Sequence, residues 1–195
     1  MISPNKITKK SFYDELKLVL KSNKISFFQL RLKKENIKKK INIAKKIKKI
    51  CKKNNVKLII NDDPHLALKV KADGCHLGQK DMNLIKAKKI LKNKIIGMTC
   101  HNSIKLAKYA LLNGASYIAL GAFYKTKTKK IKYRSSIGIL RKIKNLINLP
   151  VVAIGGINEK NYKKLLLNKA DFLAISSYIW DNKIFKPHQA IKNLK

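Results

Sequence analysis

The fold is decided by the stretch from residue 57 to residue 81, which contains Lys57-Leu-Ile-Ile-Asn-Asp62 and Asp73-Gly-Cys-His-Leu-Gly-Gln-Lys-Asp81. Each part holds a short apolar run with the length and composition of a β-strand. Polar residues follow each run, so Asp62 and Asp81 are predicted to lie beyond strand ends. Mg²⁺ prefers carboxylate oxygens and usually takes only one or two from the protein, while water and phosphate complete its ligands. The pair therefore indicates a metal site, although one such aspartate alone is often a turn or helix-capping residue.

The same pattern of apolar runs continues along the chain. From Ile25 onward, short β-rich runs alternate with longer amphipathic segments, an order that is typical of parallel α/β proteins. Strands are predicted at residues 26–30, 58–60, 74–77, 95–98, 117–120, 151–154 and 172–175. Between the first two, Ile37, Ile41, Ala44, Ile47 and Ile50 form one apolar stripe at helical spacing, which predicts a helix with this face toward the core.

The predicted architecture is a (β/α)8 TIM barrel that is incomplete at its start. A closed barrel needs eight parallel strands, one more than the sequence indicates. Ile2-Ser3-Pro4 precedes a predicted helix over Phe12 to Leu20, so only the end of a first strand is visible. We therefore expect an α/β fold whose first strand is truncated or missing at the N-terminus. A chain of 195 residues is expected to form a single domain, over residues 1–195.

Lysine dominates the composition and raises the question of a nucleic-acid partner. The formal net charge is +36, yet only Arg31, Arg134 and Arg141 are arginines. The lysines are spread evenly beside many Ile and Asn residues, a pattern that A/T-rich codons produce. Lysine also lacks the planar guanidinium suited to specific recognition. We expect no specific nucleic-acid partner, although the charge attracts anions weakly and in a salt-sensitive manner.

Other features of the sequence favour a cytoplasmic protein. No apolar run approaches the ~18 residues that span a membrane, and the N-terminus lacks an apolar export signal. Cys51, Cys75 and Cys100 show neither zinc-binding nor disulfide spacing, which predicts reduced, buried thiols. No membrane partner is expected, and homo-oligomerisation stays open.

Polar residues gather where the predicted strands end, and this is where barrel enzymes place their chemistry. Strand alternation in Gln29-Leu-Arg-Leu-Lys33 points Gln29, Arg31 and Lys33 to one face. Inward-facing cations need an anionic partner, which is either a substrate or a core carboxylate. The next three strands end near Asn61 and Asp62, near His76 and Asp81, and near Thr99 and His101. A lone histidine such as His76 is more often structural than a ligand, and Thr99 is equally suited to capping a helix.

Three later loops offer hydrogen-bond donors for phosphate oxygens. Thr126 and Thr128 alternate with lysines up to Lys129, which combines hydroxyl donors with charged ones. The diglycine Gly155-Gly156 lets backbone N–H groups approach a phosphate, and Ser176-Ser177 precedes a short helix whose dipole favours anions. The last two loops correspond to the common phosphate site of (β/α)8 barrels. A diglycine alone is a weak indication of phosphate binding, and its position in one of these loops strengthens the indication.

Taken in order, these motifs resemble those of the thiamine-phosphate synthase family, in a series from about residue 25 to residue 180. The matching segments are Gln29-Leu-Arg-Leu-Lys33, Ile60-Asn-Asp62, Gly74-Cys-His-Leu-Gly-Gln-Lys-Asp81, Gly97-Met-Thr-Cys-His101, Thr126-Lys-Thr-Lys129, Ala153-Ile-Gly-Gly-Ile157 and Ser176-Ser177. The resemblance implies a (β/α)8-barrel transferase of thiamine biosynthesis. Its small-molecule substrates would be 4-amino-2-methyl-5-(diphosphooxymethyl)pyrimidine and a thiazole phosphate, and the products thiamine phosphate and pyrophosphate, with Mg²⁺ as cofactor.

The resemblance also implies a role for each matching residue. Asp62 and Asp81 would hold Mg²⁺. The pyrimidine diphosphate would be bound by Gln29, Arg31, Lys33, Asn61, Thr99 and Lys129, and the thiazole phosphate by Thr126, Thr128, Gly156, Ser176 and Ser177. Arg31, Lys33, Thr99 and Lys129 would be the catalytic residues. The chemistry needs no nucleophilic side chain, because positive charge beside the departing pyrophosphate and correct positioning are sufficient.

Some positions depart from the family pattern. Leu32, Thr99 and Lys125 stand where Glu, Ser and Pro are usual, and Tyr178 replaces a small residue beside the thiazole-phosphate loop. Leu32 is expected to face away from the cations of its strand, so that its replacement of Glu changes packing only.

Two other functions remain open from the sequence. A thiazole tautomerase shares the barrel and a histidine near His101 but needs neither diphosphate nor metal ligands. A catalytically impaired basic barrel that binds nucleic acid or a protein would show no substrate-dependent metal binding. Asp62, Asp81, Arg31, Lys33 and Lys129 favour the synthase over the tautomerase.

Overall fold

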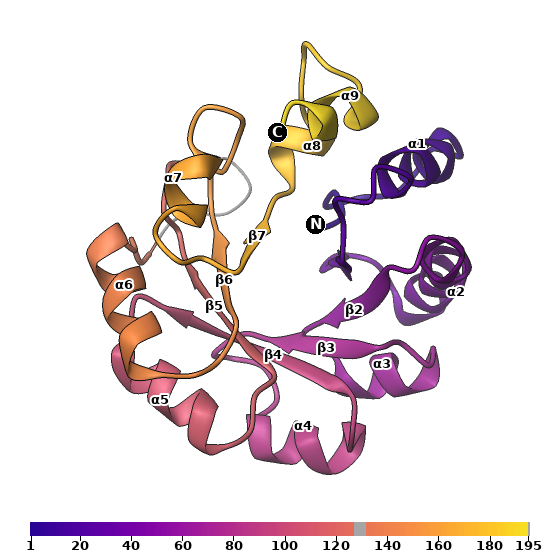
Figure 1. Cartoon of the computed structure of the whole chain (residues 1–195). Coiled ribbons are helices and arrows are strands. Elements are labelled where there is room, and N and C mark those ends of the chain that lie inside the picture. The colour runs from indigo at the N-terminus through magenta and orange to yellow at the C-terminus, as the bar shows by residue number, and fades with distance from the viewer. Residues whose placement is uncertain (127–131, 195) are drawn as a thin grey trace.

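The computed structural model describes residues 1–126 and 132–194, and within them a curled parallel sheet has helices on its outer side (Figure 1). Each strand pairs with its sequence neighbours in the order β1 to β7. The strands are β1 Phe27–Leu30, β2 Lys57–Asn61, β3 Gly74–Leu77, β4 Ile95–His101, β5 Tyr117–Gly121, β6 Val151–Ile154 and β7 Phe172–Ala174. The helices are α1 Ser11–Leu20, α2 Ile37–Lys53, α3 Pro64–Lys69, α4 Leu84–Leu91, α5 Ile104–Leu112, α6 Ile137–Leu146, α7 Tyr162–Leu166, α8 Ser177–Trp180 and α9 Pro187–Lys192. The predicted α/β alternation is confirmed.

The first residues of the chain lie between the two ends of the curled sheet, near the N label in Figure 1. Ile2 forms a parallel bridge with Gln29 of β1, and the Gln29 N–H donates to the Met1 carbonyl at 2.8 Å. On the other side, the Ile2 N–H donates to the carbonyl of Ile175, just beyond β7, at 2.9 Å. Trp180 Nε1 also donates to the Ile2 carbonyl at 2.8 Å. The N-terminal segment is thus as short as predicted, yet it links β1 to the end of β7.

The core fills the layer between the sheet and the surrounding helices. In α2, Ala44 and Ile47 are fully buried, which confirms the centre of the predicted apolar stripe. The prediction was wrong for Ile37, which is 51% exposed because it begins the helix, before the turns that pack on the sheet. Ile43 and Cys51 are buried in the later turns instead. Side chains of the strands complete this layer, among them Phe28, Leu30, Leu58, Ile60, Leu77, Ile96, Ile118 and Leu120.

The structure also bears on two predictions made from composition. Among the described residues, no helix is long and apolar enough to cross a membrane. The three cysteines are buried and unpaired, as expected.

Candidate active site

The carboxyl ends of the first strands bring the predicted polar residues together. Gln29 Nε2 of β1 donates to Asn61 Oδ1 of β2 at 2.8 Å. After Asn61, the chain turns through Asp62, which has a left-handed backbone (φ 67°) that aspartate tolerates better than most residues. Asp63 then caps α3, since its carboxylate accepts the Leu66 N–H at 2.9 Å. The tight turn from β2 into α3 therefore holds Asp62 at the strand end.

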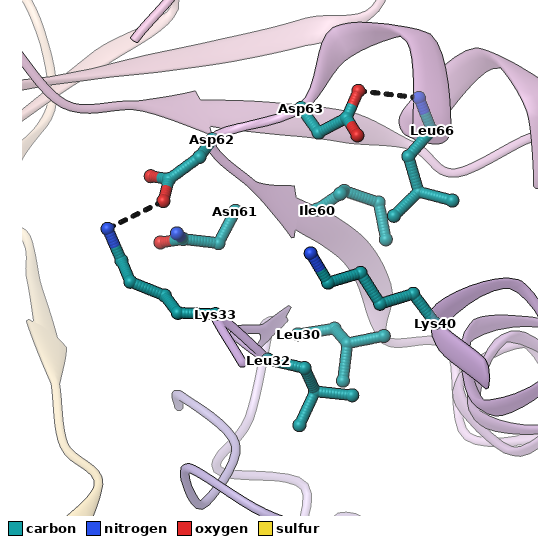
Figure 2. Close-up of a pocket in the computed structure, with 9 residues that line it drawn as sticks. All are labelled: Leu30, Leu32, Lys33, Lys40, Ile60, Asn61, Asp62, Asp63 and Leu66. Carbon is teal, nitrogen blue, oxygen red and sulfur yellow. Dashed lines mark hydrogen bonds and ion pairs between the residues drawn. The ribbon is translucent and has the colours of Figure 1, made fainter. Parts of the chain in front are cut away.

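Asp62 lies between a lysine and a second carboxyl group. Lys33 Nζ is 2.8 Å from Asp62 Oδ2 (Figure 2), and the Asp81 carboxyl group is within hydrogen-bonding range of Asp62. Burial opposes ionisation of Asp62, but the hydrogen bonds with Asp81 and Lys33 outweigh it and hold its pKa below the usual value. Asp62 is therefore ionised at neutral pH.

Asp81 reaches the same place from the loop after β3. Its Oδ2 accepts the Gly78 N–H at 2.7 Å, and a Cβ added at Gly78 would lie 2.8 Å from that oxygen. Burial raises the pKa of Asp81, and the hydrogen bond with Asp62 raises it further. Two carboxyl groups this close favour either a shared proton or a bound cation.

The donor set at this position fits Mg²⁺. Asp62 and Asp81 offer the hard oxygen ligands that this ion prefers. Over residues 1–126 and 132–194, no group of three His, Cys, Asp or Glu side chains is arranged to hold a metal. Two carboxylates leave most of an octahedral shell to water and to phosphate oxygens, which is how Mg²⁺ is commonly bound beside phosphorylated substrates.

A pocket of about 270 Å³ opens beside Asp62 (Figure 2). Its apolar lining is Leu30, Leu32, Ile60 and Leu66, and its polar lining is Lys33, Lys40, Asn61, Asp62 and Asp63. Leu32 is 5% exposed, in accord with the expectation that it faces away from the cations. Lys40 was not predicted from the sequence, and its half-buried side chain extends from α2 across the pocket. Nothing in a lysine-rich helix distinguishes it from Lys38 or Lys39.

Arg31 is held by the N-terminal segment. Its guanidinium donates to Asn5 Oδ1 at 2.8 Å, and its backbone N–H donates to Ser3 Oγ at 2.9 Å. Together with the hydrogen bonds described above, its positive charge lowers the pKa of Asp62. An amide oxygen, rather than a core carboxylate, is thus the hydrogen-bond partner of the guanidinium.

Thr99 is anchored inside the curled sheet. Its Oγ1 lies 2.9 Å from His76 Nε2, and Gln79 Nε2 donates to its backbone carbonyl. Ser103, rather than Thr99, caps the following helix by accepting the Leu106 N–H. His76 is therefore a histidine with both ring nitrogens paired, as its second nitrogen lies 3.0 Å from the Tyr117 hydroxyl. Tyr117 was not predicted from the sequence.

The diglycine of the predicted second phosphate site allows two loops to pack closely. A Cβ at Gly156 (φ 65°) would lie 2.3 Å from the Lys125 carbonyl oxygen, so only glycine fits without displacement of the backbone. The Tyr124 N–H donates to the Gly155 carbonyl at 3.0 Å. The loop after β5 is thereby held against the loop after β6, and Thr126 follows directly in the first of them.

The serines after β7 have different surroundings. Ser176 precedes α8 and donates from its hydroxyl to the Ser3 carbonyl at 3.1 Å, so it ties the N-terminal segment to this loop. Ser177 is the first residue of α8. Two further predicted site residues, Thr128 and Lys129, lie outside the described residues.

The model of the thiamine monophosphate synthase family matches residues 1–179. The chain belongs to this family. It is 68% identical to the thiamine-phosphate synthase of Pelagibacter ubique over 195 residues, which cover all of this chain and 94% of the relative. It is 40% identical to the enzyme of Clostridium acetobutylicum, with 92% of this chain and 85% of the relative covered.

A solved structure supports the same family. Thiamine phosphate pyrophosphorylase from Pyrococcus furiosus matches with a TM-score of 0.86 at 28% identity, over 99% of this chain and 91% of that one. The resemblance inferred from the ordered motifs is thus confirmed.

Proposed function

We propose that the protein is a thiamine-phosphate synthase, a transferase of thiamine biosynthesis. It joins the pyrimidine diphosphate to a thiazole phosphate and releases pyrophosphate. The observation that carries this proposal is the juxtaposition of Asp62, Asp81 and Lys33 at the end of β2, beside Arg31, in a member of this family. There, oxygens of a diphosphate can complete the ligand shell of a metal ion held by Asp62 and Asp81. Lys33 and Arg31 can contact the other charged oxygens of the diphosphate.

The residues present suit a reaction that depends on the departure of a leaving group. The carbon–oxygen bond of the pyrimidine diphosphate breaks more easily when positive charge stands where negative charge develops. Lys33 and Arg31 would supply such charge, and the family resemblance assigns the same role to Lys129. Asn61 and Gln29, hydrogen-bonded to each other, shape the neighbouring wall, and Thr99 offers a hydroxyl to the same substrate. When bound by Asp62 and Asp81, Mg²⁺ would neutralise further charge on the pyrophosphate.

The thiazole phosphate is proposed to bind on the other side of the mouth. Thr126, Thr128, Gly156, Ser176 and Ser177 would supply hydroxyl and backbone donors to its phosphate. The hydrogen bonds of Ile2 with β1 and with Ile175 support a closed barrel in which residues 1–3 take the place of the eighth strand. Phosphorylated precursors and unpaired cysteines suit a reducing cytoplasm.

The test is synthesis of thiamine phosphate from the two precursors, detected after oxidation to fluorescent thiochrome. The protein with Mg²⁺ should form product, and EDTA should abolish it. A folded sample that forms no more product than the EDTA control would contradict the proposal. Rearrangement of the thiazole phosphate without condensation would identify a tautomerase instead.

A further inference from the structure

Close polar contacts link Tyr117, His76 and Thr99, three side chains on neighbouring strands inside the curled sheet. We call this series of contacts the His76 chain. In the strand register, His76 of β3 pairs with Gly97 of β4, and Gly97 pairs with Tyr117 of β5. The Tyr117 ring lies over Gly97, because a Cβ added there would be 2.0 Å from the ring carbon that carries the hydroxyl. Tyr117 thereby reaches His76, with its oxygen 3.0 Å from Nδ1 and the two rings stacked at 5.6 Å.

The same imidazole continues to Thr99. His76 Nε2 is 2.9 Å from Thr99 Oγ1, and the Gln79 side chain holds the Thr99 carbonyl. Burial lowers the pKa of His76 to about 4, so the ring is neutral at physiological pH and has one N–H donor and one lone pair. Burial likewise raises the pKa of Tyr117, so its hydroxyl keeps its proton.

Two arrangements of protons are compatible with these distances. If Tyr117 donates to Nδ1, the imidazole proton is on Nε2 and is donated to Thr99 Oγ1, and the Thr99 proton points away from His76. If Thr99 donates to Nε2, the imidazole proton is on Nδ1 and Tyr117 becomes the acceptor. The phenol proton then has no acceptor among the described residues, and such unpaired polar groups are avoided inside proteins. The first arrangement pairs the phenol proton and turns the Thr99 proton away from His76, on a side chain that is partly exposed.

We propose that Tyr117 and His76 are positioning residues that fix the Thr99 hydroxyl as a hydrogen-bond donor toward the pyrimidine diphosphate. The inference rests on the proposed function for the identity of the substrate, whereas the direction of the proton chain follows from the contacts alone. In this setting, one lone pair of the Thr99 oxygen accepts the His76 Nε2–H, and the Thr99 proton is left for an acceptor atom of the substrate.

The first experiment reads the tautomer without any need for activity. In ¹⁵N-labelled protein, the His76 resonances are assigned by their loss in His76→Asn, and the nitrogen shifts identify which ring nitrogen carries the proton. The expected result is protonation at Nε2. A ring protonated at Nδ1 would overturn the proposal, whether or not the protein is a synthase.

The second experiment is a double-mutant cycle of Tyr117→Phe and Thr99→Val, read by steady-state kinetics of thiamine phosphate formation. Tyr117→Phe keeps the ring over Gly97 and removes only the hydroxyl; it should lower kcat/KM for the pyrimidine diphosphate about tenfold and leave the KM for the thiazole phosphate unchanged. In the Thr99→Val background, the same change should have less than about a twofold effect, because the hydroxyl that it orients is gone. Effects that multiply independently, or an unaltered Tyr117→Phe enzyme, would refute the positioning role.

Tyr109→Phe is the matched control for the loss of a phenol. The Tyr109 hydroxyl, on α5, accepts from Asn83 Nδ2 at 3.0 Å and so pairs with the residue before α4 rather than with His76. Its removal should leave kcat/KM for both substrates within about twofold. An equal loss in both Tyr→Phe variants would mean that the effect is a general consequence of destabilisation. Inactivity of the wild type would instead contradict the proposed function while leaving the tautomer result valid.

Discussion

Replacing Asp62 with Asn separates the proposed metal site from the general electrostatics of the loop. Its neighbour Asp63 provides a matched control, because Asp63→Asn makes the same charge change one residue away. Asp63 caps α3, and asparagine is an equally good N-cap, so the control keeps its helix. Asp62 has a left-handed backbone, a conformation that asparagine also tolerates. Neither variant should misfold.

The expected loss of activity is far larger than the loss of stability. The Lys33–Asp62 pair is partly exposed, with side-chain exposures of 51% and 26%, and such pairs contribute about 0–1 kcal/mol. For a chain of this length, that corresponds to a fall in Tm of no more than about 4 °C. Loss of one preorganised electrostatic group at the reacting centre costs about 10²–10³ in kcat. Asp63→Asn should stay within about threefold of the wild type.

The assay combines thiochrome kinetics at varied Mg²⁺ with thermal unfolding of the same samples. We expect a folded Asp62→Asn enzyme with a rate at least about 100-fold lower than the wild type at every Mg²⁺ concentration. Equal losses in the Asp62 and Asp63 variants, or an Asp62 variant within threefold of the wild type, would refute the assignment of Asp62 as a metal ligand.

Three further predictions concern stability, pH and substrate binding. Gly97→Ala should destabilise the fold by about 1–3 kcal/mol because its Cβ meets the Tyr117 ring, whereas Gly138→Ala, with its nearest neighbour 3.8 Å away, should be neutral or stabilising by up to about 1 kcal/mol in thermal unfolding. Because folding raises the pKa of Asp81, the stability that its neutral form contributes is present at acid pH and is lost as the pH rises through the raised pKa. In calorimetry, the Tm of Asp81→Asn should therefore gain on that of the wild type as the pH rises above the ordinary carboxyl pKa of about 4, and a constant difference would contradict this. Lys40→Met should raise the KM for the pyrimidine diphosphate severalfold at low salt, while Lys38→Met, on the exposed side of α2, should not.

The elements of the fold were predictable because their signals are local. Apolar runs such as 74–77 and 151–154 mark buried parallel strands wherever they occur, and the structure has β3 and β6 at these residues. The pairing of Ile2 with both β1 and Ile175 was not predictable, because it depends on how the two ends of the sheet approach one another. The sequence indicates that the first strand is short, but it does not indicate which parts of the sheet that segment pairs with.

Site residues of a type that is scarce in this chain were predicted from the sequence, and those of a common type were not. Asp62 and Asp81 are prominent because acidic residues are scarce in this chain, and the structure brings their carboxyl groups together. Lys40 has no such distinction in a lysine-rich helix. The contact of Tyr117 with His76 joins residues 41 positions apart, and it depends on the register of three strands and on the missing side chain of Gly97. A pattern within one segment of the sequence does not specify how three separate strands are aligned.

The measurement that tests the central claim most directly is calorimetric titration of the pyrimidine diphosphate into the protein with Mg²⁺ and with EDTA. If Asp62 and Asp81 form a metal site that the diphosphate completes, binding should be tight only with Mg²⁺, and Asp62→Asn should bind as weakly with Mg²⁺ as the wild type does with EDTA. Equal affinity of the wild type in both conditions would contradict the account.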